Sequence, residues 1–300
     1  MKCFSSVVAA GTVFLGFLFV ALALPVHAEA PPAGQGLTNP FFALSNGVQD
    51  AKHPTPDSQA AMLKELGYDG IGPSGVHGIP EMLKALDAHG LKMCALYIGV
   101  NLDPDKPKYD PKLAEVINTL KGRDTIIWLY ILRGKHQPSS SDADARVVEV
   151  VREIAAMAER AGLRVALYPH VGFYVARVED AVRVVEKVDR KNVGVTFNLC
   201  HWLKLDKPES MKRLMELAMP HLFVVTINGA DPEGGWDRLI QTLDRGSFDT
   251  YGFLKTLKDL DYNGPIGLQC YAVKGDKYEN LKRSMAAWRG FSSRLAAEKN

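Results

Sequence analysis

A repeated alternation of short apolar runs and amphipathic segments constrains this chain more than any other feature. From residue 41 onward, each apolar run is followed by a polar turn and then by a segment with apolar residues at three- and four-residue spacing. Runs that are apolar on both faces are typical of parallel strands covered by helices. The predicted strands are FFALS (41–45), YDGIG (68–72), KMCALYIGV (92–100), TIIWLYIL (125–132), RVALYP (164–169), VGVTFN (193–198), LFVVTIN (222–228) and PIGLQCY (265–271).

Helix signals occupy the intervals between these runs. The segment 55–67 ends at Gly67, and the segment 79–90 has Pro80 in its first turn and Gly90 at its end. Further helices are predicted over 110–122, 141–162, 177–188, 207–218, 247–264 and 276–298. Eight strand–helix pairs without a break in composition predict a single α/β domain over residues 41–300, a (β/α)8 TIM barrel. A doubly wound open sheet is the alternative, but no Gly-x-Gly-x-x-Gly follows the first predicted strand.

The first 28 residues are interpreted as a cleavable signal peptide. Lys2 precedes a long uncharged run, Pro25 interrupts it, and Val26-His27-Ala28 provides the small residues of a cleavage site. We expect cleavage near Ala28, a Pro- and Gly-rich flexible lead-in over 29–40, and a periplasmic or secreted product. The rival interpretation is an uncleaved anchor, because the apolar run approaches the ~20 residues that span a bilayer. After cleavage no stable membrane span is expected.

Charge and glycine patterns argue against some binding partners, and the cysteine positions predict the state of the thiols. The chain has 36 Lys and Arg against 34 Asp and Glu, and this even balance gives no electrostatic case for nucleic acid. No Gly-rich loop predicts a phosphate cradle, so no nucleotide cofactor is expected. Cys94, Cys200 and Cys270 lie in apolar runs and are predicted to be buried thiols. The sequence leaves a homo-oligomer open.

Histidines stand where a barrel places its chemistry, at the carboxyl ends of the strands. His170 closes the fifth predicted strand, and His201 follows the sixth by three positions. Histidine titrates near neutral pH and is suited to act as a general base. We predict His201, His170 and Lys135 as catalytic residues, with Lys135 polarising a carbonyl group. The alternatives are structural histidines and a solvated loop lysine.

Aromatic and amide side chains accompany these residues. Aromatic rings pack against the CH faces of sugars, and amides hydrogen-bond to hydroxyl groups. This combination predicts a small-molecule carbohydrate as the substrate. The predicted substrate-binding residues are Tyr168, Trp202, Asn228, Trp236 and Tyr271.

The stretch RVALYPHVGFYVARVEDAVRVVEKVDRKNVGVTFNLCHWLK, with VVTINGAD and GPIGLQCY after it, resembles the xylose isomerase-like TIM-barrel superfamily of sugar isomerases and epimerases. The resemblance covers essentially the whole chain after the signal peptide. It implies one divalent metal held by glutamate, aspartate and histidine, with two glutamates as an acid–base pair. This sequence departs from that pattern: Tyr168 stands at the first glutamate position, Asn198 replaces the aspartate, and Gln269 replaces the last glutamate.

The mapped metal ligands are therefore neutral. They are His170, Asn198, His201 and Gln269. Neutral nitrogen and oxygen donors suit Mn, Zn, Co or Ni better than Mg, which prefers carboxylates. A divalent transition metal is thus one expectation, weaker than in a carboxylate site.

Three function classes follow from the resemblance and the residues. The first is an exported carbohydrate enzyme that abstracts a proton next to a sugar carbonyl, as an isomerase, an epimerase, or a lyase or hydratase on keto-glycosides. The second is a non-catalytic sugar-binding barrel that has lost the glutamate pair. The third, metal-dependent hydrolysis of the nuclease type, is disfavoured because the strand ends lack a dense set of acidic ligands.

Overall fold

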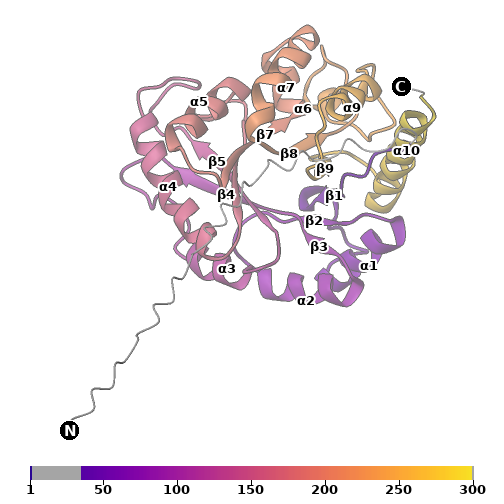
Figure 1. Ribbon diagram of the computed structural model, residues 1–300. Helices are drawn as coiled ribbons and strands as arrows, with labels where there is room; N and C mark the ends of the chain where they lie inside the picture. Colours follow the sequence, from indigo (N-terminus) through magenta and orange to yellow (C-terminus); the bar gives the residue numbers. More distant parts are fainter. Residues whose placement is uncertain (2–34, 299–300) are drawn as a thin grey trace. The chain divides into compact units, whose positions relative to one another are not determined.

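Nine parallel strands form the centre of the molecule in the computed structural model, which describes Met1 and residues 35–298 (Figure 1). Their order around the sheet is β3-β2-β1-β9-β8-β7-β6-β5-β4. The strands are β1 (Phe41–Leu44), β2 (Gly70–Gly72), β3 (Lys92–Met93), β4 (Ala95–Asn101), β5 (Ile126–Leu132), β6 (Arg164–Leu167), β7 (Val193–Asn198), β8 (Leu222–Ile227) and β9 (Ile266–Leu268). The predicted parallel arrangement is confirmed.

The barrel is nearly closed because β3 and β4 are two parts of one predicted strand. The chain is interrupted at Cys94, where β3 pairs with β2 and β4 pairs with β5. The backbone of Cys94 donates to Ile71, and that of Tyr97 donates to Pro73. The segment 92–101 therefore borders β2 on one side and β5 on the other, and the predicted TIM-barrel architecture is confirmed.

Helices surround the strands (Figure 1). They are α1 (Pro56–Leu66), α2 (Ile79–His89), α3 (Leu113–Thr119), α4 (Asp144–Arg160), α5 (Val178–Val188), α6 (Leu199–Leu205), α7 (Met211–Ala218), α8 (Trp236–Leu239), α9 (Thr250–Asp259) and α10 (Lys277–Ala297). Each predicted helix is present, with one or both ends shortened. In the predicted segment 207–218, a 3-10 turn over Pro208–Ser210 precedes α7.

Two short helices, α6 and α8, were not predicted. Residues 199–203 of α6 are all buried, and Lys204 is its one exposed residue. A helix of seven residues, five of them buried in a row, gives no 3.6-residue periodicity, and the sequence therefore predicted a loop after the strand. This difference matters because α6 carries His201.

The barrel interior is filled by a small cluster of its own, separate from the larger core between strands and helices. Its buried members include Phe42, Trp128 and Tyr168. Glycines on neighbouring strands make room for the Phe42 ring, because a Cβ at Gly72 or Gly267 would approach it to 2.9 or 2.7 Å. Large rings thus close the middle of the barrel and leave chemistry to the ends of the strands.

The predicted signal peptide, apart from Met1, lies outside the described residues. The described part of the lead-in, residues 35–40, is docked rather than free: Leu37 donates to the Ser292 hydroxyl, and Asn39 donates to the carbonyl oxygens of Tyr262 and Gly264. Among the described helices, none is both long and apolar enough to cross a bilayer. Cys94, Cys200 and Cys270 are buried free thiols, as expected.

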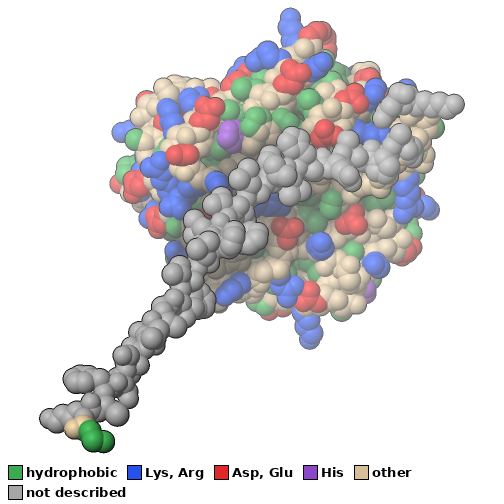
Figure 2. All heavy atoms as spheres, viewed as in Figure 1, with side chains coloured by type: hydrophobic (Ala, Val, Ile, Leu, Met, Phe, Trp, Pro, Cys, Tyr) green, Lys and Arg blue, Asp and Glu red, His purple; other side chains and the backbone are tan. Residues whose placement is uncertain are grey.

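Acidic and basic side chains are interspersed over the visible part of the face shown in Figure 2. This mixture agrees with the near balance of charge in the sequence. That face therefore offers no extended basic surface of the kind that binds nucleic acid.

Candidate active site

Two histidines meet at the carboxyl end of the barrel. His170 follows β6, and His201 lies in α6, directly after β7. Because β6 and β7 are neighbouring parallel strands, their ends bring the two imidazole rings to a centroid distance of 3.9 Å. Residues 31 positions apart in the sequence thus form one pair.

Local backbone contacts fix the tautomer of His170. Its Nδ1 lies 2.8 Å from the carbonyl oxygen of Val171, which only accepts, so Nδ1 carries the proton and Nε2 keeps its lone pair. Burial lowers the pKa of His170 below its usual value, and the bond to Val171 offsets part of this effect. His170 is therefore neutral at pH 7, with an unprotonated nitrogen ready to accept a proton.

His201 is more deeply enclosed, with 6% of its surface exposed. Burial, and secondarily the nearby His170, lower its pKa well below the usual value. Its Nδ1 is buried and has no hydrogen-bond partner among the described residues. A buried polar atom without a partner is costly, so this atom marks a place where a ligand or water would be stabilising.

Polar side chains lie beside the histidine pair, where the Tyr168 ring is 5.9 Å from that of His201. Gln269 accepts hydrogen bonds at Oε1 from the Asn46 side chain and the Tyr271 backbone, at 2.9 and 3.0 Å. Its Nε2 lies 3.5 Å from the Tyr168 hydroxyl. Burial raises the pKa of Tyr168 well above its usual value, and the amides of Asn198 and Gln269 offset only part of this rise. Tyr168 is therefore a neutral hydrogen-bond donor.

Asn198 is buried at the end of β7, where its side chain is only half used. Its Oδ1 accepts from the Cys200 thiol at 3.3 Å, while its Nδ2 makes no hydrogen bond of normal geometry with a described residue, although it lies close enough to the Tyr168 hydroxyl to lower the pKa of that group. With His201 Nδ1 this gives two unpaired polar atoms at the same end of the barrel. Such a concentration is typical of a binding site rather than of a packed core.

Aromatic rings pack against both histidines. Phe173 stacks on His170 at 3.9 Å, and Trp236 lies edge-on to His201 at 5.6 Å. The predicted residues Trp236 and Tyr271 are 44% and 63% exposed, so both are accessible to a ligand. Rings beside polar groups form the kind of surface that sugars bind.

Two aromatic residues of the wall were missed from the sequence. Tyr130 belongs to β5 and packs against Phe173 at 5.5 Å. The signal was its two-residue spacing from Trp128, which puts both rings on the inner face of the strand. Phe173 lies in the β6–α5 loop, where no periodicity marks it.

Three predicted residues, Trp202, Asn228 and Lys135, make no ring contact or hydrogen bond with His170 or His201 among the described contacts. Trp202 points into the helix-facing core, packs on Phe197 at 5.5 Å, and donates to Ser210. Asn228 donates to two backbone carbonyl oxygens and holds its own loop. Both were predicted to bind substrate. α6 turns Trp202 into the core, which speaks against this role, whereas the buried Oδ1 of Asn228 has no partner among the described residues, so its role stays a prediction.

Lys135 lies exposed in the β5–α4 loop and makes no hydrogen bond or ion pair with a described residue. Its predicted action on a carbonyl group stays a prediction.

The buried Asp144 carboxylate and the partly exposed cations around it form a network that supports the loop carrying His170. Asp144 accepts from the Tyr174 hydroxyl at 2.8 Å, from Arg183 Nε at 3.0 Å and from Lys187 Nζ at 2.6 Å. Burial alone would raise the pKa of Asp144, but these hydrogen bonds lower it below the usual value. Since Tyr174 is four residues from His170, the network anchors the segment that positions the imidazole.

The residues mapped from the resemblance do not fit a carboxylate-ligated metal site. No group of three or more His, Cys, Asp and Glu side chains suited to a metal occurs among the described residues. In addition, Nδ1 of His170 faces a carbonyl, and Oε1 of Gln269 already accepts two hydrogen bonds. A divalent ion could still use Nε2 of His170 and Nδ1 of His201, but it would have to displace the contacts of Gln269 and would gain only neutral donors.

Comparison with known proteins identifies the family of this chain. A family model for the xylose isomerase-like TIM barrel matches residues 60–290, and the chain belongs to this family. A search of curated proteins finds no match.

Solved structures with this architecture include the 3-keto-D-glucoside 4-epimerase YcjR from E. coli. It has a TM-score of 0.70 and 18% identity, with 84% of this chain and 99% of that one covered. A D-allulose 3-epimerase from Methylomonas sp. has a TM-score of 0.67 and 16% identity, with 87% and 100% covered. A xylose isomerase-like protein from Mycobacterium smegmatis, in complex with magnesium, has a TM-score of 0.64 and 17% identity, with 87% and 98% covered. At these identities the likeness shows the fold.

Proposed function

We propose that the protein is an enzyme that abstracts a proton from the carbon next to the carbonyl group of a neutral keto-sugar. The observation that carries this proposal is the state of His170: a neutral imidazole whose Nδ1 donates to Val171 and whose Nε2 makes no hydrogen bond with a described residue. It lies at the end of the barrel where enzymes of this architecture hold their reacting groups. Two structural neighbours are named as epimerases of sugars.

The proposed step needs only side chains of this chain. Nε2 of His170 takes the proton, and the electron pair of the broken C–H bond moves toward the carbonyl oxygen, which becomes an enolate. Donors are required where that negative charge develops. The uncharged donors proposed for this role are the Tyr168 hydroxyl, whose ring lies 5.9 Å from that of His201, and the Nδ2 of Asn198, both buried at this end of the barrel.

The two histidines favour reactions on one face of the sugar. Inversion at a carbon needs an acid and a base on opposite faces, with the substrate between them. The rings of His170 and His201 are 3.9 Å apart, which leaves no space for a sugar between them. In an isomerisation, the protonated His170 would instead return its proton to the former carbonyl carbon, while the proton of the neighbouring hydroxyl moves to the enolate oxygen. In an elimination, the enolate electron pair would break the C–O bond on the far side of the deprotonated carbon, and His170 would protonate the departing oxygen. We therefore favour an isomerase or an eliminating lyase over an epimerase.

A divalent ion stays an expectation that metal analysis can test, because one structural neighbour was solved in complex with magnesium and the family resemblance implies a metal. The proposed steps do not pass through it, because the donor set is neutral and partly engaged. We further propose that the enzyme is exported, on the basis of residues 1–28.

A sugar-binding barrel without turnover is the second candidate. The absence of the glutamate pair favours it, as do the exposed rings of Trp236 and Tyr271. It differs from the enzyme in one respect: it binds a keto-sugar without exchanging that sugar's protons.

Solvent exchange tests the proposal. The purified protein is incubated in D₂O with methyl 3-keto-glucoside, and the signals of the protons next to the carbonyl are followed by NMR against a protein-free control. We expect faster loss of one of these signals, with an isomerised or eliminated product following. Binding of the sugar without faster exchange would support the second candidate.

A further inference from the structure

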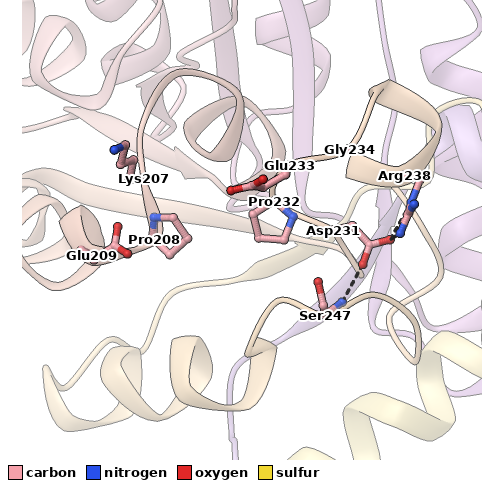
Figure 3. Close-up of a pocket in the computed structure, with 9 residues that line it drawn as sticks. All are labelled: Lys207, Pro208, Glu209, Asp231, Pro232, Glu233, Gly234, Arg238 and Ser247. Atoms are coloured by element: carbon pink, nitrogen blue, oxygen red, sulfur yellow. Dashed lines mark hydrogen bonds and ion pairs between the residues drawn. The ribbon is translucent and has the colours of Figure 1, made fainter.

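A cavity in the loops after α6 and β8 is lined by neither His170 nor His201 (Figure 3). Its volume is about 590 Å³. One wall is the segment Asp231–Gly234 after β8, with Arg238 and Ser247, and the opposite wall is the segment Lys207–Glu209 after α6. The proposed reaction does not use any of these residues.

Chain connectivity places this cavity on the same side of the barrel rim as His201. The segment Lys207–Glu209 begins six residues after His201, at the far end of α6. The other wall precedes Trp236 by two residues, and the Trp236 ring lies 5.6 Å from His201. The two segments that form the cavity are thus continuations of those that bring His201 and Trp236 together.

One wall of the cavity is already organised. Asp231 accepts from Arg238 Nε at 3.0 Å, from Gln241 at 3.0 Å and from the Ser247 backbone at 2.9 Å. The Arg238 and Ser247 contacts hold the pKa of Asp231 at about 2. These contacts fix the shape of the loop that carries Trp236.

The remaining polar side chains of the cavity are unengaged. Lys207, Glu209 and Glu233 are exposed and make no side-chain hydrogen bond or ion pair with another described residue. Three carboxylates and two cations line the cavity, a net charge of −1, which disfavours a phosphate or carboxylate group. Carboxylates and a lysine that are not engaged with other side chains suit pairs of hydroxyl groups, which they bind by charge-assisted hydrogen bonds.

We propose that this cavity is a second sugar subsite, so that the substrate is a glycoside whose keto-sugar unit lies at the histidines and whose second sugar extends past Trp236. This inference rests on the proposed function for its first unit. The Trp236 ring, 44% exposed and with Lys204 Nζ 5.6 Å from its centroid, offers its remaining apolar surface between the two positions. A single sugar ring would leave the second cavity empty.

The test compares a 3-keto-disaccharide with methyl 3-keto-glucoside in the same exchange and binding measurements. The double variant Glu209→Gln/Glu233→Gln should lose about tenfold in kcat/KM and in affinity for the disaccharide, and less than about twofold for the methyl glycoside. Asp237→Asn, an exposed carboxylate of α8 that does not line the cavity, is the matched control and should change neither.

The outcomes separate the two proposals. Exchange of both sugars with equal effects of the double variant overturns the subsite alone. Disaccharide-selective binding that the double variant weakens, without any exchange, supports the subsite and overturns the proposed reaction. Absence of both binding and exchange for the two sugars overturns both.

Discussion

Two buried polar clusters lie on either side of the loop after β6, and they differ in how their hydrogen bonds are used. The cluster around Asp144 is charged and internally bonded, with Arg183, Lys187 and Tyr174 all donating to one carboxylate. The cluster around His170 is neutral, and two of its buried nitrogen atoms, on His201 and Asn198, have no partner in the described residues.

This difference indicates that one cluster is structural and that the other is a candidate binding site. A buried charge is stable only when its partners are in place, so a fully bonded network resists movement. An unpaired buried atom is tolerated where a ligand or water satisfies it. The charged cluster therefore holds the loop, and the neutral cluster is available for chemistry.

The largest expected effect is on catalysis. His170→Gln removes the proposed base while keeping a side chain of similar reach, and we expect at least a 100-fold loss of exchange rate. His89→Gln, at the end of α2, is the matched control and should retain the full rate. Rates are measured by NMR in D₂O. A retained rate in His170→Gln would remove the histidine from the reaction.

The supporting cluster should instead govern stability. Asp144→Ala leaves Arg183 and Lys187 without their shared acceptor, and we expect a loss of about 2–3 kcal/mol in the free energy of unfolding, reduced from the value of a fully buried pair because both cations are partly exposed. Urea denaturation measures it. Glu149→Ala, on the exposed face of the same helix, should cost less than about 0.5 kcal/mol. Equal effects of the two variants would contradict the assigned support role.

The amount of bound metal should depend on whether the ligands at positions 198 and 269 are neutral or charged. Asn198→Asp with Gln269→Glu restores the carboxylates that the family resemblance implies, and we expect at least a tenfold gain in bound Mn or Zn per chain over the natural protein. Plasma mass spectrometry after dialysis measures it. A full complement of metal in the natural protein would show that the neutral donors suffice.

Stability should fall in acid because the histidine pair resists protonation. The folded-state pKa values of both histidines are lowered by burial, so below pH 6.5 the unfolded chain binds more protons than the folded one. The expected loss is at most about 1.4 kcal/mol per pH unit for each histidine. His201→Gln should flatten this dependence in urea denaturation between pH 7 and 5. Parallel curves for the two proteins would argue against a neutral His201.

The smallest effect is expected at a buried hydroxyl. Thr226 lies inside β8 with no partner for its Oγ1 among the described residues, so Thr226→Val should leave stability unchanged or raise it by up to about 1 kcal/mol. Ser284→Ala is the contrasting control, because that hydroxyl bonds to Asn280 and Leu243, and it should lose about 1 kcal/mol. Thermal unfolding separates the two.

Much of the fold followed from local pattern. Runs such as 125–132 and 193–198 are apolar on both faces, and they became β5 and β7 within one residue of the predicted bounds. His170, Asn198 and Gln269 were singled out because they end such runs. The break at Cys94 and the short helix α6 were missed, since both depend on contacts with neighbouring strands and not on periodicity.

The sequence by itself determined the strand–helix alternation, the parallel barrel and the lack of acidic residues at the mapped positions, because each is written in residue type and spacing. Only the tertiary structure decided which of those residues meet. It brought His170 to His201, turned Trp202 into the core, and joined the segments after α6 and β8 around one cavity. The physical reason is that strand register and helix direction set side-chain neighbours across long sequence separations, and local periodicity does not encode them.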